Sequence, residues 1–138
     1  MNYLDILNAR ERKYRIIWHI TFLSLIFLKA IFVCSIFILG KFKDELCDGL
    51  VGFIIIYSLY FLINKENRSN YLFLCLIGWP LLIFGVLFGA YIDCIFLGLP
   101  SVFSMNVFLS ILLSFLFLVS TWRFRKICKL IRREYDKP

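Results

Sequence analysis

Charge is scarce in this chain, and so are the residues that interrupt helices. Of its 138 residues, 62% are hydrophobic and 18% are charged, and the mean hydropathy is +0.85. Soluble domains contain roughly 45–50% apolar residues, so this composition excludes an ordinary soluble protein. Three prolines and seven glycines are too few for a disordered or linker-rich chain. For this length we expect one compact unit and no separate soluble domain.

The chain also lacks the side chains from which most active sites are built. Its single histidine, His19, has no second histidine or intramembrane carboxylate to form a metal site with. No Ser–His–Asp set falls at a common membrane depth, and no phosphate-binding loop is present. The five cysteines contain no CxxC pair, which argues against a thiol-redox enzyme. We therefore expect no catalytic residue, metal or cofactor, and a protein that is not an enzyme.

Apolar residues are instead concentrated in four stretches. Roughly 20 apolar residues in a helix span the ~30 Å of bilayer hydrocarbon. The second stretch is short for a span, although Asp48 is a suitable N-cap for it, and Pro80 should kink the third. We predict an all-α fold, a polytopic four-transmembrane-helix bundle over residues 16–122, with helices at 16–39, 49–63, 71–92 and 102–122.

Both ends of the chain are basic and amphipathic. In the arm of residues 1–15, an apolar helical face predicts a short interfacial helix that leads into the first span, although a solvated arm fits the same composition. That face consists of Leu4, Leu7, Tyr14 and Trp18. In the tail of residues 123–138 the helical pattern continues, with an apolar stripe at Phe124, Ile127, Ile131 and Tyr135.

Most of the 16 Lys and Arg residues fall on one side of the predicted spans. They are Arg10, Arg12, Lys13 and Arg15 in the arm, Lys65 and Arg68 in the turn after the second span, and Arg123, Arg125, Lys126, Lys129, Arg132, Arg133 and Lys137 in the tail. The opposite side holds only Lys41 and Lys43. Positively charged loops stay in the cytoplasm, so both termini are expected there. An even number of spans agrees with this topology.

Lys29 is the one charged residue within the first span, and it lies close to the middle. A lysine there costs on the order of 3 kcal/mol on insertion scales, so it is a candidate functional residue. It would then serve an ion pathway, a ligand or a contact between subunits. Alternatively, its long side chain reaches the outer interface and pairs with Asp48 or Asp93. We favour this outward contact, or a contact with another helix, because no acidic residue is predicted at mid-membrane.

Two helix faces carry small residues. Gly78, Gly85 and Gly89 share a face of the third span, and Gly85–Gly89 forms a GxxxG motif that allows another backbone to approach. The fourth span has a small polar stripe that includes Asn106, Ser110 and Ser114. Because a packed monomer needs one such face, the second predicts a homo-oligomer.

Two further features concern the two sides of the membrane. Cys47 and Cys94 are predicted at the outer ends of the second and third spans, where they could form one disulfide in a periplasm. The basic arm and tail are expected to bind anionic lipid of the cytoplasmic leaflet or an acidic cytoplasmic partner. The net charge of +7 first reports orientation and lipid contact in such a protein, so direct nucleic-acid binding is not expected.

The four predicted spans, the two cytoplasmic ends and the basic cytoplasmic face resemble the small four-helix membrane subunit of bacterial anti-phage defence systems of the Kiwa type. The resemblance covers the whole chain and lies in the architecture. It implies an oligomeric membrane sensor that recruits a cytoplasmic effector through residues 10–15 and 123–133. Abundant Phe and Tyr with few Ala favour an AT-rich bacterial gene, and hence the bacterial cell inner membrane as the location.

Two alternatives remain open at this point. Some immunity proteins against pore-forming bacteriocins are similar in having four spans with both ends inside, and would neutralise a toxin helix at Gly85 and Gly89 or at Lys29. A small oligomeric channel, lined by the Asn106–Ser110–Ser114 stripe, is the third candidate. Small drug exporters match poorly, because they carry a membrane-embedded Glu in the first helix where this chain has Lys29.

Overall fold

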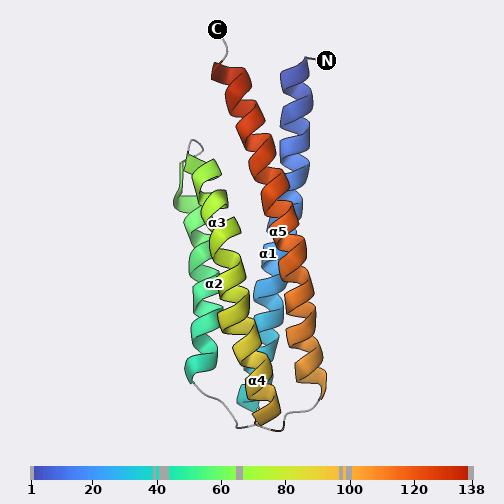
Figure 1. Cartoon of the computed structure of the whole chain (residues 1–138), viewed down its shortest axis with the longest axis vertical. Coiled ribbons are helices and arrows are strands. Elements are labelled where there is room, and N and C mark those ends of the chain that lie inside the picture. Colours follow the sequence, from blue (N-terminus) through green and yellow to red (C-terminus); the bar gives the residue numbers. More distant parts are fainter. Residues whose placement is uncertain are drawn as a thin grey trace.

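A computed structural model describes residues 2–38, 40, 44–64, 67–96, 98 and 101–136, apart from the side chains of residues 44–48, 93, 101, 102 and 136. The described chain is helical (Figure 1). Its elements are α1 (Tyr3–Ile38), α2 (Asp44–Leu62), α3 (Arg68–Leu82), the π-helical turn η2 (Ile83–Leu87), α4 (Phe88–Phe96) and α5 (Ser101–Asp136). The predicted all-α fold is therefore confirmed for these residues.

The helices form an elongated bundle with both termini at the same end (Figure 1). α1 and α5 run antiparallel and contact each other over most of their length. α3, η2 and α4 follow one another as a single rod that packs on α5, whereas α2 packs mainly on α1. The turn between α2 and α3 lies toward the end that holds the termini, but α1 and α5 continue beyond it.

Three of the helical rods are long and apolar enough to cross a membrane. They are Tyr3–Ile38, Arg68–Phe96 and Phe103–Tyr135, and they cover three of the four predicted spans. The apolar part of α2, Gly49–Leu62, is shorter than a usual span. α1 passes the predicted boundary at residue 15 without a break, and α5 continues through the predicted tail. The arm and the tail are thus extensions of the first and last helices.

The core is built from aromatic rings that α1 places against α2, α3 and α5. Trp18 is fully buried, and its indole Nε1 donates a hydrogen bond to Thr121 Oγ1 at 2.9 Å. Its ring lies 5.7 Å from the ring of Phe117 and 4.7 Å from that of Tyr60. Trp79 continues the cluster, with its ring centroid 4.4 Å from that of Phe117. Trp18 and Phe22 in α1, and Phe117 and Phe124 in α5, are four and seven residues apart, so each pair lies on the core-facing side of its helix.

The irregularity expected at Pro80 occurs one turn later, as the π-helical turn η2. Pro80 lies inside α3, and the Phe88 amide donates to the carbonyl of Ile83, five residues earlier. Membrane helices tolerate proline because local 3₁₀ or π adjustments satisfy the backbone groups that it frees. The extra residue in this turn also places Val86 against α2, where a Cβ on Gly49 would lie only 2.6 Å from Val86 Cγ1. Gly49 therefore allows α2 to approach η2.

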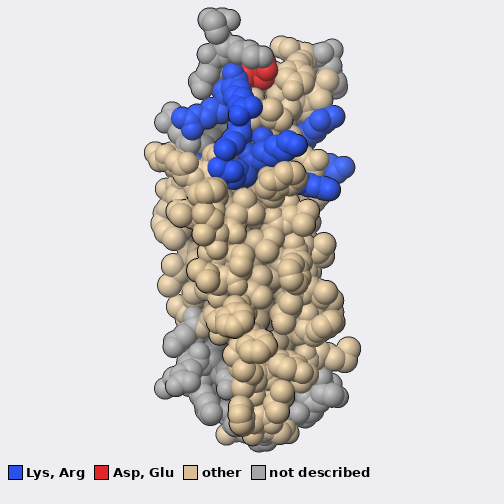
Figure 2. Space-filling model, viewed as in Figure 1, with Lys and Arg blue, Asp and Glu red and all other residues tan. Residues whose placement is uncertain are grey.

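Between its two ends the face drawn in Figure 2 shows no Lys, Arg, Asp or Glu among the described residues. Phe27 on α1, Leu81 on α3 and Phe84 in η2 are exposed by 65%, 74% and 71%. Large exposed apolar residues also occur on α2 and α5. A soluble monomer rarely exposes apolar area on this scale, so the surface is suited to the interior of a bilayer.

Candidate functional site

The α1–α5 pair is longer than a bilayer requires. Each helix has 36 residues. At a rise of about 1.5 Å per residue each is about 54 Å long, against about 30 Å of hydrocarbon. The excess lies at the end that holds the termini, where the two helices continue past the α2–α3 turn (Figure 1). We call this part, residues 3–15 and 123–136, the helical stalk.

A small apolar core holds the stalk together. Leu7 of α1 is exposed by only 1%, and Ile127 and Ile131 of α5 by 6% and 8%. Leu4, Tyr14 and Leu130 pack against these three residues. The apolar faces predicted for the arm and for the tail therefore pack against each other, so that the stalk continues the bundle as a two-helix pair.

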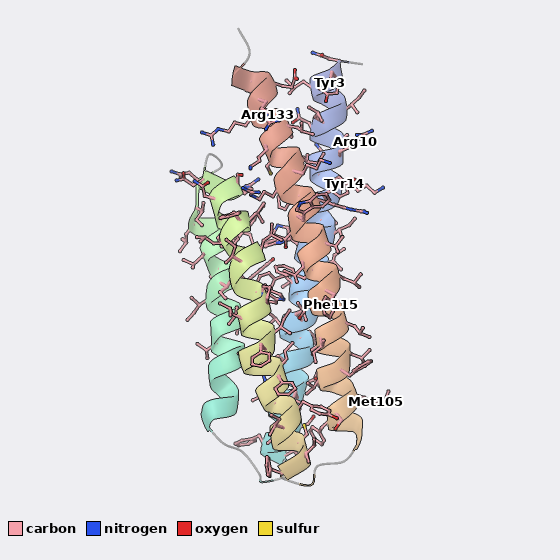
Figure 3. All side chains as sticks on the ribbon, in the orientation of Figure 1. Tyr3, Arg10, Tyr14, Met105, Phe115 and Arg133 are labelled. Atoms are coloured by element: carbon pink, nitrogen blue, oxygen red, sulfur yellow. The ribbon has the colours of Figure 1, made fainter. Side chains whose placement is uncertain are left out.

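Basic side chains surround this small core. Figure 2 shows Lys and Arg gathered in a band toward the end that holds the termini. Figure 3 shows Arg10 on α1 and Arg133 on α5 in that part of the molecule, far along the pair from Phe115 and Met105. Of the ten predicted docking residues, Arg15 and Arg125 are half-buried. The other eight are exposed: Arg10, Arg12, Lys13, Arg123, Lys126, Lys129, Arg132 and Arg133.

At the base of the stalk the cations lie over aromatic rings. Lys126 Nζ lies 5.3 Å from the ring centroid of Trp122, which is 53% exposed. The Arg125 guanidinium lies 4.6 Å from the ring centroid of Phe73, and Arg125 Nε donates to the carbonyl of Ser69 at 3.3 Å. Trp, Arg and Lys at a helix end are typical of a membrane–water interface, where the ring stays in the apolar layer and the cation reaches the headgroups.

Glu11 joins the stalk to the α2–α3 turn. Its Oε1 lies 3.4 Å from Arg15 Nη1 and 3.6 Å from Arg68 Nη1. The side chains of Glu11 and Arg68 are exposed by only 13% and 18%, so solvent screens this pair less than a surface pair. The Arg68 guanidinium also lies 5.0 Å from the ring centroid of Tyr60 on α2. The four residues connect α1, α2 and the start of α3.

The sequence contained only part of the information needed to find this contact. Glu11 and Arg15 are four residues apart, which is the spacing of a helical ion pair. Arg68 is far from both in the chain, and the sequence indicates only that it is a basic residue of the turn after the second predicted span. Its role depends on how the α2–α3 hairpin packs against α1.

Lys29 is buried in the second half of α1, close to the middle of the predicted first span, and is only 3% exposed. Its Nζ lies 5.0 Å from the ring centroid of Phe32. A Cβ on Gly49 would lie 3.3 Å from Lys29 Cε and 3.7 Å from Nζ, so the amine end of the side chain is next to α2. The expected partners, Asp48 and Asp93, have side chains outside the described residues. Pairing with either one stays a prediction.

The two small-residue faces have different surroundings. Ser110 and Ser114 are buried, and their hydroxyls donate to carbonyls one turn earlier in α5. Asn106 Nδ2 donates to the carbonyl of Leu28 at 3.2 Å, so the polar stripe packs against α1. By contrast, a Cβ added at each of the three glycines would have no described neighbour within 4 Å; these are Gly78, Gly85 and Gly89. The glycine face is therefore open as far as the described residues extend.

The remaining candidates do not converge on a reaction centre within the described residues. His19 Nδ1 lies 3.0 Å from the hydroxyl of Tyr57, and its ring packs edge-on against Trp18. Over the described part of the chain, no three His, Cys, Asp or Glu side chains gather as a metal site would require. Cys94 is buried, and the side chain of Cys47 lies outside the described residues, so the disulfide stays untested.

No protein-family model, curated protein or solved structure matches this chain. The features of this chain that bear on function are the stalk, the basic band and the short helix α2.

Proposed function

We propose that the protein is a non-enzymatic subunit of the bacterial inner membrane with four spans and both termini in the cytoplasm. Three helices of sufficient length and the exposed apolar middle of the bundle support insertion into a membrane. The gathering of basic residues at the end with the termini supports the orientation, because positively charged segments remain in the cytoplasm.

In this proposal the stalk anchors a cytoplasmic effector protein. The observation that carries it is the pairing of α1 and α5 beyond the α2–α3 turn, through an apolar core that crossing the bilayer does not require. Two paired helices give a rigid, basic surface outside the membrane. Such a surface suits an acidic protein partner, because complementary charge speeds association and selects the partner.

The distance of each basic residue from the membrane interface decides whether it contacts lipid or a protein partner. Trp122 and its neighbour Lys126 mark the interface level on α5. Each headgroup layer is roughly 5–7 Å thick. At about 1.5 Å per residue, Lys129 lies about 10 Å and Arg133 about 16 Å above Trp122. Arg125 and Lys126 are therefore assigned to the anionic lipid surface, and Lys129, Arg132 and Arg133 to the partner.

The resemblance to Kiwa-type membrane subunits supports a role in anti-phage defence, in which the bundle senses a perturbed membrane and the stalk holds the effector. The homo-oligomer belongs to the same proposal, and the open glycine face supports it. Isoleucine at Gly85 and Gly89 should then shift the detergent-solubilised protein to a smaller species on native gels. An unchanged oligomer would assign its interface to another face.

The test of the anchor is quantitative purification of the tagged protein from its native cells in mild detergent. We expect one soluble protein at a fixed stoichiometry, encoded beside this gene, and its loss from the variant K129E/R132E/R133E. The matched control K41E/K43E carries the same kind of charge reversal in the segment of the sequence between α1 and α2 and should retain the partner. Loss of the partner from both variants, or from neither, would contradict docking on the stalk.

Immunity against a pore-forming toxin is the second candidate, and the open glycine face favours it. A toxin helix would pack on Gly85 and Gly89, where no described residue lies within 4 Å of an added Cβ. A toxin gene beside this one, and protection that is lost in Gly85→Ile but kept in the stalk variant, would support it. The channel is not proposed, since Asn106 bonds to α1 and both Ser110 and Ser114 are buried within the monomer.

A further inference from the structure

Two arginines from different helices converge on one carboxylate at the base of the stalk. Arg15 Nη1 of α1 and Arg68 Nη1 of α3 lie 3.4 and 3.6 Å from the same atom, Glu11 Oε1. Among the described residues, no other carboxylate forms an ion pair with either guanidinium. We call these three residues the interface cluster. Because two positive charges share one negative charge, the cluster retains one net positive charge.

This excess charge is partly withdrawn from water. The guanidinium of Arg68, whose side chain is 18% exposed, lies over the ring of Tyr60. Arg68 Nε and the Tyr60 hydroxyl are buried, and neither has a hydrogen-bond partner within the described part of the chain. The side chain of Arg15 is 37% exposed, so the cluster is accessible from the α1 side. A partly buried cation that is not neutralised is costly, and the cluster therefore favours a further anion.

The cluster lies where the apolar surface of the bundle begins. Ile16, the residue after Arg15, is 50% exposed, and Phe61 near the end of α2 is 64% exposed. The ring of Phe61 stacks on that of His19, one turn along α1 from Arg15, with 5.8 Å between the centroids. Apolar side chains of two helices thus adjoin the cluster on its membrane side. In the proposed orientation this is the level of the lipid headgroups in the cytoplasmic leaflet.

We propose that Arg15 and Arg68 hold the phosphate of one anionic phospholipid, whose acyl chains follow the apolar surface between α1 and α2. Guanidinium groups match phosphate oxygens with paired N–H donors. Basic pockets between membrane helices on the cytoplasmic side are typical binding sites for lipid headgroups. A phosphodiester with one negative charge, as in phosphatidylglycerol, neutralises the cluster. A zwitterionic lipid brings an ammonium group as well, which restores the excess positive charge.

This site differs from the contact of Arg125 and Lys126 with the leaflet, because it holds a single lipid between two helices. Glu11 competes with the lipid, since its carboxylate already accepts from both arginines and repels a phosphate. Removal of that negative charge should therefore favour binding. The inference rests on the membrane insertion proposed above and names the lipid bound at one point of the interface. It requires no effector, so its failure can be told apart from failure of the anchor.

The test is native mass spectrometry of the full chain in mild detergent, titrated with dioleoyl phosphatidylglycerol or dioleoyl phosphatidylcholine. The natural chain should bind one phosphatidylglycerol about tenfold more tightly than phosphatidylcholine. R15Q/R68Q should lose this preference, because it removes both guanidiniums. The matched control R132Q/R133Q removes two exposed arginines further along the stalk and should keep it. Inorganic phosphate at the lipid concentration should not displace the lipid, because it lacks acyl chains.

Glu11→Gln separates a lipid site from a purely structural role of the cluster. It removes the competing charge, so the affinity for phosphatidylglycerol should rise about threefold, even though the contact between the stalk and the turn is weakened. If the cluster only held the fold together, Glu11→Gln and R15Q/R68Q would both lower the affinity. That result would overturn the proposal, as would an unchanged preference in R15Q/R68Q, an equal loss in R132Q/R133Q, or displacement of the lipid by inorganic phosphate.

Discussion

The α1–α5 pair and α2 are both helical and apolar, but they are held by the bundle in opposite ways. The pair is in contact along its length, and its core contains Trp18 and Phe117, both with 0% exposure. α2 is short, packs mainly on one neighbour and has most of its large apolar side chains on the surface. The comparison teaches that the pair is fixed by a core along its length, whereas α2 is attached through a few buried rings such as Phe53 and Tyr60.

The largest loss of stability is expected when the Trp18 side chain is removed from the core of the α1–α5 pair. Trp18→Ala removes a fully buried ring and the hydrogen bond to Thr121, so the free energy of unfolding should fall by about 3–5 kcal/mol. Titration with SDS in mixed micelles, followed by circular dichroism, measures it. Phe27→Ala removes a ring that is 65% exposed and serves as the control. Similar losses in both variants would contradict a core centred on Trp18.

A smaller effect is expected at Gly49, where α2 packs against η2. Gly49→Ala places a Cβ 2.6 Å from Val86 Cγ1, and overpacking of this kind costs about 1–3 kcal/mol. Gly52→Ala, one turn along the same helix, has open space and should be neutral or stabilise by about 0.5–1 kcal/mol. The same SDS titration compares them. If Gly49→Ala is as well tolerated as Gly52→Ala, α2 does not sit against η2 at this point.

The smallest effect is expected where the stalk meets the α2–α3 turn. Glu11→Gln removes the charge that pairs with Arg15 and Arg68, and should destabilise the protein by about 1 kcal/mol at low salt. High salt should reduce the difference. Arg12→Gln, on the exposed surface of the stalk, is the control and should change little. A salt-independent loss would point to packing instead of charge.

The helices and the basic end could be predicted from the sequence because both depend on local pattern. Apolar stretches of sufficient length indicate spans, and the positions of Lys and Arg indicate which ends lie together. The amphipathic stripes at Leu7 and Ile127 were visible as well, but an apolar stripe does not reveal what covers it. The structure shows that the two stripes cover each other.

What could not be predicted depends on contacts between distant residues. Gly49 was only the first residue of a span in the sequence, although it is the glycine at which two elements meet. The glycines at 78, 85 and 89 carried the recognisable motif, yet no helix approaches them within the described chain. Spacing reports which residues share a face, whereas the occupant of that face depends on the whole fold.

The central claim is that the α1–α5 pair crosses the membrane and projects from it into the cytoplasm. The most direct measurement is the reaction of a membrane-impermeant hydrazide with p-acetylphenylalanine placed at Arg133 or at Phe115, in intact and in permeabilised spheroplasts. The account predicts that the label at Arg133 reacts only after permeabilisation, and that the one at Phe115 reacts in neither. Reaction at Arg133 in intact spheroplasts, or its failure in both preparations, would contradict the claim.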